Sequence, residues 1–276
     1  NPLLGKPSGD TRTICKTPML YRMQCRMDKD VAEWEADHTL KTDSASKGNS
    51  CLLAALLRSL QAEIAVKLNQ KAGCIFNDFH KFFDNISAKV LIEKARSNDF
   101  PPLGLLFALR QHLAPRCVQA GGISTKPTTV TSSILAGCKF SVALTRTILF
   151  DSYLEIAMNN SEVQVGVQVD DTPLSSTAPD NSSLEYNLRN AGIHFTELVK
   201  LLKLPLSGKA QICCSDFTTA TKLANQLHKE GLHLKPVRNS RDVGIDYTAG
   251  KPNDGMSKTT KKGLMPPNLA NLKFPN

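Results

Sequence analysis

Two adjacent carboxylates follow an alternating segment in the middle of this chain. Valine occupies the odd positions and Gln, Gly and Gln the even ones from Val163 to Val169, and Asp170 and Asp171 come next. The alternation has the period of a half-buried β-strand and predicts that Asp170 shares the polar face with Gln164 and Gln168. Carboxylates this close repel each other, which favours a divalent cation or strong hydrogen-bond donors beside them. A solvated turn between two strands explains the pair equally well.

A third carboxylate stands at the end of another predicted strand. The segment Gly73–Asn77 is short and mostly apolar, and Asp78 follows it just before a helical pattern begins. A two-metal phosphoryl-transfer site needs acidic residues at such strand ends, because two Mg²⁺ ions roughly 3.5–4 Å apart must be neutralised and oriented. Asp78, Asp170 and Asp171 are therefore candidate catalytic residues and metal ligands.

These motifs resemble those of a known family. The run Asp78–Asp84 resembles the first palm motif of reverse transcriptases, and Val169-Asp170-Asp171 resembles their paired-aspartate motif. Four further parts of the chain resemble parts of the same enzymes in the same order. They are the basic fingers segments Lys6–Ile14 and Leu20–Arg22, the glycine-then-helix motif Ile134–Leu144, the lysine-bearing palm segment Leu204–Lys209 and the primer-grip hairpin Arg241–Asp246.

The resemblance implies an RNA-directed DNA polymerase of a non-LTR-type retroelement. Such an enzyme adds dNTPs to the 3′-hydroxyl of a DNA or RNA primer on an RNA template, using two Mg²⁺ ions or, in their place, Mn²⁺. Asp78 and Asp170 would bind both ions, and Asp171 would adjust the field or lend an oxygen. Lys209 would approach the triphosphate or pyrophosphate, although an exposed strand-edge lysine explains that residue as well.

The resemblance also implies a set of substrate contacts. Phe83 stands where the family places a bulky ring under the sugar, which would exclude a ribose 2′-hydroxyl and so select deoxynucleotides. Core packing is the other explanation for Phe82 and Phe83, and we expect it to hold for one of them. By resemblance, Arg12 and Lys6 would bind the triphosphate, Gly137 and Ser141 would face the template and primer, and Val243 and Gly244 would form the primer grip.

The chain departs from the family pattern in two places, and two alternatives stay open. The segment before Gly137 lacks the Pro-Gln-Gly triad, and residues 251–276 contain no convincing thumb helix. An RNA-directed RNA polymerase also uses three palm aspartates, and there Asp84 would bind the 2′-hydroxyl. Thr145, however, stands where viral RNA polymerases usually place an Asn. The other alternative is a catalytically inactive, nucleic-acid-binding relic of the palm fold.

Composition agrees with a polyanionic partner. The 276 residues carry a net charge of +9, and lysine and arginine are concentrated near both ends. None of the eight cysteines forms a CxxC pair, and no His lies at zinc-ligand spacing, which favours a reducing, intracellular compartment, with the nucleus compatible with a retroelement enzyme. No apolar run has membrane-spanning length, and the missing initiator Met suggests an excised domain. Nothing in the sequence specifies an oligomeric state.

The apolar patterns predict an α+β fold. The resemblance implies the palm and fingers of a right-hand polymerase, with an antiparallel palm sheet backed by helices and the thumb absent or incomplete. A helix is expected at Cys51–Leu68 with its leucines in the core, and a polar loop at Ser175–Ser183. The expected division is 1–70 fingers, 71–90 palm with the first aspartate motif, 91–133 fingers again, 134–250 palm, and 251–276 a poorly ordered basic tail.

Overall fold

A five-stranded sheet lies at the centre of the computed structural model, which describes residues 3–5, 11–13, 17–117, 119–120 and 123–250. The strand order is β6-β7-β3-β8-β9. Neighbouring strands are antiparallel except β8 and β9, which are parallel and joined by α9 (Phe217–Lys229). The α+β class predicted from the sequence is therefore confirmed. The strands are β6 (Gln164–Val165), β7 (Thr172–Ala178), β3 (Lys71–Asn77), β8 (Gln211–Cys214) and β9 (Lys235–Val237).

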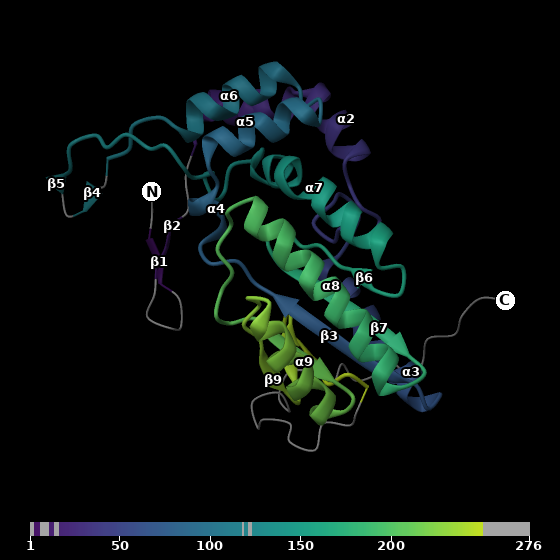
Figure 1. Ribbon diagram of the computed structural model, residues 1–276. Coiled ribbons are helices and arrows are strands. Elements are labelled where there is room, and N and C mark those ends of the chain that lie inside the picture. The colour runs from purple at the N-terminus through teal and green to yellow at the C-terminus, as the bar shows by residue number, and fades with distance from the viewer. Residues whose placement is uncertain (1–2, 6–10, 14–16, 118, 121–122, 251–276) are drawn as a thin grey trace, which may run out of the picture.

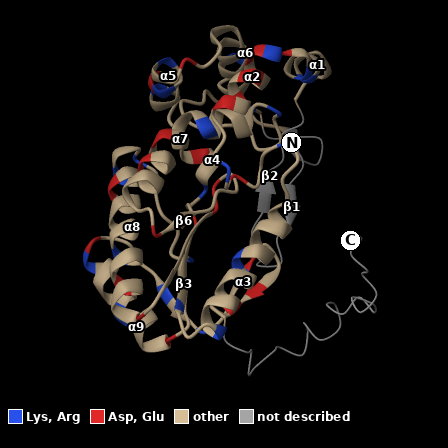
Figure 2. Cartoon of the chain, turned by 90° about the vertical axis from the view of Figure 1, so that its right-hand side faces the viewer, with Lys and Arg blue, Asp and Glu red and all other residues tan. Residues whose placement is uncertain are grey.

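The central strand β3 is covered on both faces. Figure 2 shows α8 (Asn181–Leu201) and α9 on one side of β3 and α3 (Cys51–Lys67) on the other. Gly73 and Ile75 face α8, and a Cβ on Gly73 would lie only 2.9 Å from the Leu188 side chain. Ala72 and Cys74 point the other way and form a second, smaller core with α3. Because both faces are buried, β3 is an almost continuous apolar run.

Helix α3 turns its small residues inward and its large ones outward, so the expectation of a leucine core there was wrong. Its buried residues are Ala55, Ala62 and Ala65. Ala62 and Ala65 pack with Ala72 and Cys74 of β3 in the smaller core. The chain after β11 also lies close to α3: a Cβ on Gly250 would lie 2.3 Å from the Ala62 carbonyl oxygen. The apolar residues of the opposite face are 47 to 58% exposed, and they are Leu52, Leu53, Leu56, Leu57, Leu60 and Ile64.

The polar loop expected at Ser175–Ser183 is also wrong for its first half. Strand β7 continues to Ala178 and pairs with β3 over seven residues, from Asn77↔Thr172 to Lys71↔Ala178. Pairing along a central strand satisfies the backbone polar groups of this Ser- and Thr-rich segment, which outweighs its composition. Helix α8 then begins at Asn181, where the Asp180 carboxylate accepts the Ser183 N–H at 2.8 Å.

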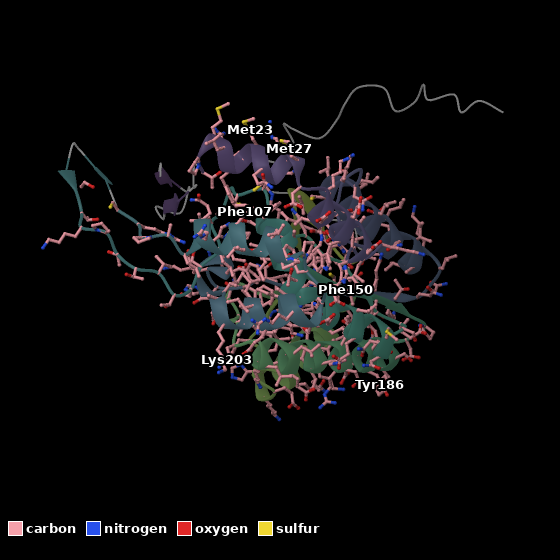
Figure 3. All side chains as sticks on the ribbon, turned by 90° about the horizontal axis from the view of Figure 1, so that it is seen from above. Met23, Met27, Phe107, Phe150, Tyr186 and Lys203 are labelled. Atoms are coloured by element: carbon pink, nitrogen blue, oxygen red, sulfur yellow. The ribbon has the colours of Figure 1, made fainter. Side chains whose placement is uncertain are left out.

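A layer of helices lies beyond one end of the sheet (Figure 1). The long helix α7 is buried along much of its length and contacts α5, α8 and β6. Exposed methionines of α1, among them Met23 and Met27, point outward at the edge of this layer (Figure 3). The helices are α1 (Met19–Met27), α2 (Lys29–Asp37), α4 (Phe82–Asn85), α5 (Ala88–Ser97), α6 (Pro102–His112) and α7 (Ser141–Asn159).

Trp34 of α2 and the prolines before α6 shape this layer. Trp34 is a packing anchor: its indole N–H donates to the Asn98 carbonyl at 2.7 Å, and its ring meets Phe100 edge-on. Helix α5 ends at Ser97, and α6 begins at Pro102 directly after Pro101. None of the described helices is long and apolar enough to cross a membrane.

Three two-stranded sheets complete the described part of the chain. The first pairs β1 (Leu3–Gly5) with β2 (Thr11–Thr13), and the second pairs β4 (Gln119–Ala120) with β5 (Ile123–Ser124). The third pairs β10 (Ser240–Asp242) with β11 (Ile245–Tyr247) and confirms the hairpin predicted at Arg241–Asp246. The predicted tail, 251–276, lies outside the described residues.

Candidate active site

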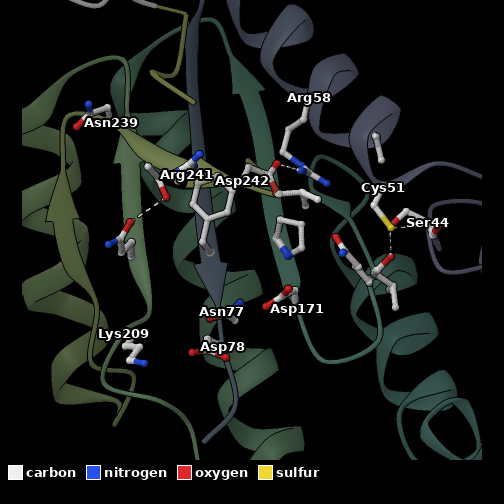
Figure 4. A pocket seen from close by; sticks show the side chains of 18 residues that line it. Ser44, Cys51, Arg58, Asn77, Asp78, Asp171, Lys209, Asn239, Arg241 and Asp242 are labelled. Atoms are coloured by element: carbon white, nitrogen blue, oxygen red, sulfur yellow. Dashed lines mark hydrogen bonds and ion pairs between the residues drawn. The ribbon is translucent and has the colours of Figure 1, made fainter. Parts of the chain in front are cut away.

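The pairing of β3 with β7 brings two predicted site residues together. Asn77 is the last residue of β3 and pairs with Thr172, the first residue of β7. Asp78 follows Asn77 and Asp171 precedes Thr172, so the two carboxylates leave the sheet at the same end from neighbouring strands. Both side chains line one cavity, and Figure 4 shows them next to each other at one end of it.

A tight turn presents the paired aspartates. Gln168 and Asp171 exchange two backbone hydrogen bonds, at 2.9 and 3.0 Å, which leaves Val169 and Asp170 as the two central residues. Val169 has a φ of +59°, a left-handed conformation that a β-branched residue rarely adopts. Asp170 is half-buried at the turn, and it is not among the described residues that line the cavity.

The segment before this turn differs from its prediction. A strand was expected from Val163 to Val169, but β6 ends at Val165. The Gly166 N–H still bonds the Pro173 carbonyl at 2.8 Å, whereas Val167 turns to a different partner, the segment 42–44. The alternating pattern fits pairing with β7 and pairing with residues 42–44 equally well. It indicates which side chains are buried, but it does not indicate which segment forms the backbone hydrogen bonds.

The cavity has a volume of about 470 Å³ and carries both signs of charge. Asp78 and Asp171 supply the negative end, and lysine and arginine side chains line other parts of the wall. A cavity of this size and polarity suits an anionic ligand. A bound cation would lie between that ligand and the carboxylates. The basic and polar residues that line it include Lys209, Arg58, Arg241, Asn239, Ser240, Gln211, Gln168 and Ser44.

Lys209 lies on the cavity wall because its loop is tied to Asp78. The Ser207 N–H donates to the Asp78 carbonyl at 2.8 Å, and the Ser207 hydroxyl accepts the Lys209 N–H at 3.2 Å. The His80 N–H donates to the Pro205 carbonyl at 2.9 Å and pairs the same two segments a second time. The structure thus places the predicted cation in the cavity that Asp78 lines.

An ion pair that the sequence analysis missed forms another part of the wall. Arg58 of α3 pairs with Asp242 of β10, and their side chains are 10 and 8% exposed. Burial raises the pKa of the Asp242 carboxyl, and the charge and hydrogen bond of Arg58 oppose that rise. A Cβ on Gly166 would lie 2.7 Å from Arg58 Nη2, so the glycine in the valine-rich segment makes room for this guanidinium. Arg58 itself was the available signal, as a lone arginine in a leucine-rich helix.

Three other predicted site residues lie outside the set that lines the cavity. Phe83 is half-buried and its ring packs edge-on against the buried Phe82, 5.5 Å away. Gly137 has a φ of +97° in a turn closed by a bond from the Cys138 N–H to the Leu135 carbonyl, so this position does need glycine. Ser141 is 3% exposed and donates its hydroxyl to the same Leu135 carbonyl at 2.7 Å.

The remaining predicted site residues have different positions. Val243 and Gly244 form the turn of the β10–β11 hairpin, with φ of 49° and 88°, and Val243 lines the cavity. Arg12 pairs with Leu4 between β1 and β2, and only its backbone is described. Lys6 lies outside the described residues.

Two carboxylates of the cavity match the ligands that Mg²⁺ prefers. Asp78 and Asp171 offer carboxylate oxygens, which Mg²⁺ prefers, and this ion commonly takes one or two protein carboxylates and completes its shell with water and substrate phosphates. In the described part of the chain, no group of three or more His, Cys, Asp or Glu side chains is placed to hold a metal ion. The pair therefore fits Mg²⁺ that shares its remaining ligands with a substrate.

Comparison with known proteins locates the fold. No family model and no curated protein matches the chain. A solved telomerase from Candida tropicalis, in complex with a TWJ fragment of telomeric RNA, matches 78% of this chain with a TM-score of 0.52 and 12% sequence identity. The chain has a polymerase-like fold. At 12% identity the likeness is one of fold alone, and it agrees with the mixed helix and sheet fold described above.

Two further telomerases match at lower similarity. Apo telomerase from Candida tropicalis, truncated from its C-terminal domain, matches 88% of this chain with a TM-score of 0.48 and 10% identity. Telomerase from Candida albicans with a TWJ fragment of telomeric RNA matches 87% with a TM-score of 0.49 and 11% identity. This chain spans 52, 40 and 38% of the truncated Candida tropicalis chain, the RNA-bound one and the Candida albicans chain, respectively.

Proposed function

We propose that this chain is the polymerase portion of an RNA-directed DNA polymerase of a non-LTR-type retroelement, which adds dNTPs to a primer 3′-hydroxyl. The observation that carries the proposal is the placement of Asp78 and Asp171 at one end of a single cavity, with Lys209 on its wall. The polymerase-like fold supports the same reading. Carboxylates at neighbouring strand ends and a nearby cation are the groups that nucleotidyl transfer requires.

The carboxylates and the cations of the site have separate roles in this proposal. Asp78 and Asp171 would hold Mg²⁺, which replaces the pair expected from the sequence, Asp78 and Asp170, because Asp171 lines the cavity and Asp170 does not. Asp170 at the turn would add negative charge beside them. The chemistry supplied by the bound ions is activation of the primer hydroxyl and neutralisation of the triphosphate. Lys209 lies where it meets phosphate oxygens, and Arg241 adds a second cation on the wall. The protein mainly positions groups and neutralises charge.

The proposed partners rest on the net charge of this chain and on the RNA that a similar solved structure contains. The net charge of +9 favours RNA and DNA backbones. The similar Candida tropicalis telomerase was solved with an RNA fragment, which supports RNA binding by this chain, and the RNA template is part of the proposal. Phe83, half-buried beside Phe82, is the residue we propose to select deoxynucleotides, and its ring would have to become accessible to the sugar.

Primer extension tests the proposal. The protein is incubated with an RNA template, a DNA primer and Mg²⁺, with dNTPs and NTPs offered in parallel. We expect extension with dNTPs only. Asp78→Asn and Asp171→Asn should each lower the rate at least about 10³-fold while template binding is kept, because they remove metal-binding charge without removing the fold.

The matched control is Asp99→Asn. Asp99 is exposed and does not line the cavity, and its φ of 50° is tolerated by Asn as well as by Asp. This variant should extend primers at the wild-type rate. Extension with NTPs alone would replace the proposal with an RNA-directed RNA polymerase. RNA binding with no extension by the wild-type chain would indicate a catalytically inactive relic of the palm fold.

A further inference from the structure

A buried cluster of charged side chains lies next to the paired-aspartate turn. Arg146 of α7 is 6% exposed, and its Nε donates to the Asp43 carboxylate at 2.7 Å. Its Nη1 donates to the Glu35 carboxylate of α2. Asp43 is 3% exposed. One guanidinium therefore joins two helices and the segment that carries Asp43, and its planar fork suits two acceptors at once.

Asp43 belongs to the segment that takes over the backbone pairing of the hairpin. Ser44 donates both its N–H, at 2.8 Å, and its hydroxyl, at 3.0 Å, to the Val167 carbonyl. The Val167 N–H donates to the Thr42 carbonyl at 3.3 Å. Residues 42–44 thus bind both polar groups of Val167, at the point where the pairing of β6 with β7 has ended.

Val167 stands two residues before the strained centre of the turn. Val169 is held at a φ of +59°, a conformation that persists in a β-branched residue only where the surroundings enforce it. Arg146, Val167 and Val169 together line a small cavity of about 20 Å³, so the guanidinium and the turn are neighbours in space. The turn sets where Asp171 meets Asp78.

A second contact restrains the other side of the turn. The Tyr153 hydroxyl of α7 lies 2.6 Å from the Thr172 hydroxyl, and Thr172 is the residue after Asp171. Tyr153 and Arg146 are both on α7, seven residues apart, and so lie on the same side of that helix. Helix α7 therefore holds the hairpin before the turn through Arg146 and Asp43, and after it through Tyr153.

We propose that Arg146 is a positioning residue for the paired-aspartate turn: by binding Asp43 and Glu35 it holds the segment 42–44 against Val167 and so fixes where Asp170 and Asp171 stand. Its consequence for catalysis rests on the function proposed above. The structural part is independent of that function and can be measured on the protein alone. Arg146 does not line the cavity of the candidate active site, so it acts through the turn.

Hydrogen exchange of the hairpin tests the structural part. The variant is Arg146→Lys, which keeps the charge but has no fork that reaches both carboxylates. Exchange of the amides of Gln168 and Asp171, which close the turn, should become at least about tenfold faster. The matched control is Lys94→Met, which removes the more exposed ion pair between Lys94 of α5 and Asp151 of α7, and it should leave these amides unchanged.

A second variant guards against loss of folding. Glu35→Gln removes the charge of the more exposed partner, 36% exposed, and should accelerate the same amides to a smaller degree. Unchanged exchange at Gln168 and Asp171 in both folded variants would overturn the proposal. If Arg146→Lys does not fold, the outcome for Glu35→Gln decides the question.

Primer extension tests the catalytic part. Arg146→Lys should lower kcat at least about tenfold and raise the Mg²⁺ concentration at half-maximal rate, with template binding unchanged, because the carboxylates are displaced and the nucleic-acid surface is kept. If Arg146 only stabilised the fold, the variant protein that remains folded would show the wild-type Mg²⁺ concentration at half-maximal rate. If the wild-type chain does not extend primers, only the proposed function is contradicted. If the amides of Gln168 and Asp171 exchange at the wild-type rate in the variants, only this inference is contradicted.

Discussion

Arg58 of α3 and Asp242 of the β10–β11 hairpin form a buried ion pair across the wall of the candidate active site, although 184 positions separate them in the sequence. The pair joins a helix on one face of the sheet to a hairpin that shares the cavity with Asp78. It passes close to Gly166, where any larger residue would collide with the guanidinium. The shape of the cavity therefore depends on an ion pair in which Arg58 belongs to none of the recognised motifs and Asp242 lies in the predicted primer-grip hairpin.

Arg58→Met should lower the free energy of unfolding by about 3 kcal/mol, because it leaves the Asp242 carboxylate buried without its cation. Asp242→Asn should cost less, since the amide oxygen still accepts from Arg58. The double variant should lose less than the two single variants added together, and urea denaturation of all four proteins measures this coupling. Strictly additive losses would show that the two side chains do not interact in solution.

Val243→Asn should stabilise the chain by about 0.5–1 kcal/mol. Val243 and Gly244 both have positive φ in a two-residue hairpin turn, a geometry for which Asn-Gly is the preferred sequence. Val243 is 40% exposed, so little apolar contact is lost. Urea denaturation gives the difference, and Val237→Asn, in the neighbouring strand β9, should destabilise instead. A loss of stability in Val243→Asn would mean that the positive φ is not kept.

Parts of the site could be predicted because the signal is local. Asp78 and the paired aspartates each follow a short apolar segment, and Lys209 follows a Pro-Leu-Ser-Gly turn, so the chain itself indicates that these residues stand at element ends. Their convergence depends on strand register, which the resemblance supplied and the residues did not. Arg58 stands out as a lone arginine in a leucine-rich helix, but its pairing with Asp242 could not be predicted, because nothing near either residue in the sequence specifies the other.

The errors share a physical origin: sequence patterns describe faces, whereas packing decides which partner a face meets. The leucines of α3 were expected in the core, but the close approach of the helix to β3 selects its alanines. The Ser- and Thr-rich residues 175–178 were expected in a loop, but pairing with the central strand makes them part of β7. The strand before the turn was expected to reach Val169, but segment 42–44 takes Val167 from it.

The outward face of α3 gives a direct test of this reversal. Leu56→Gln and Leu60→Gln should each change the free energy of unfolding by less than about 1 kcal/mol, because both side chains are about half exposed in the folded chain. Leu188→Ala is the contrasting variant: Leu188 is fully buried against β3, and its truncation should cost about 3 kcal/mol. Equal losses at Leu56 and Leu188 would show that α3 buries its leucines after all.

Lys209→Met should weaken nucleotide use without weakening the fold. The side chain is exposed on the cavity wall, so its removal should leave thermal unfolding unchanged and raise the KM for dNTPs about tenfold or more, as expected for one lost charge-assisted phosphate contact. Lys203→Met is the matched control, because Lys203 is an exposed lysine outside the cavity lining. An equal change in both variants would point to a general effect of net charge.

Stability should fall in mild acid through His112. Burial, followed by the nearby Arg116 charge, lowers the pKa of this imidazole from 6.5 to about 4. Its Nδ1 accepts the Leu135 N–H at 3.2 Å, and protonation of Nδ1 would abolish that bond. The unfolded chain therefore binds the proton more readily than the folded chain, and this contribution, about 3 kcal/mol in full, is present above pH 6.5 and lost as the pH falls towards 4.

Denaturation in urea at pH 7.5 and at pH 4.5 measures the effect of His112. The variant His112→Gln does not titrate, and its amide oxygen can accept the Leu135 N–H, so its stability should depend less steeply on pH. His80→Gln is the control, because His80 is exposed and its backbone N–H, rather than its ring, makes the bond to Pro205. If the free energy of unfolding falls equally for wild type and His112→Gln between pH 7.5 and pH 4.5, groups other than His112 cause the acid sensitivity. The bond from the Leu135 N–H to His112 would then contribute equally at both pH values.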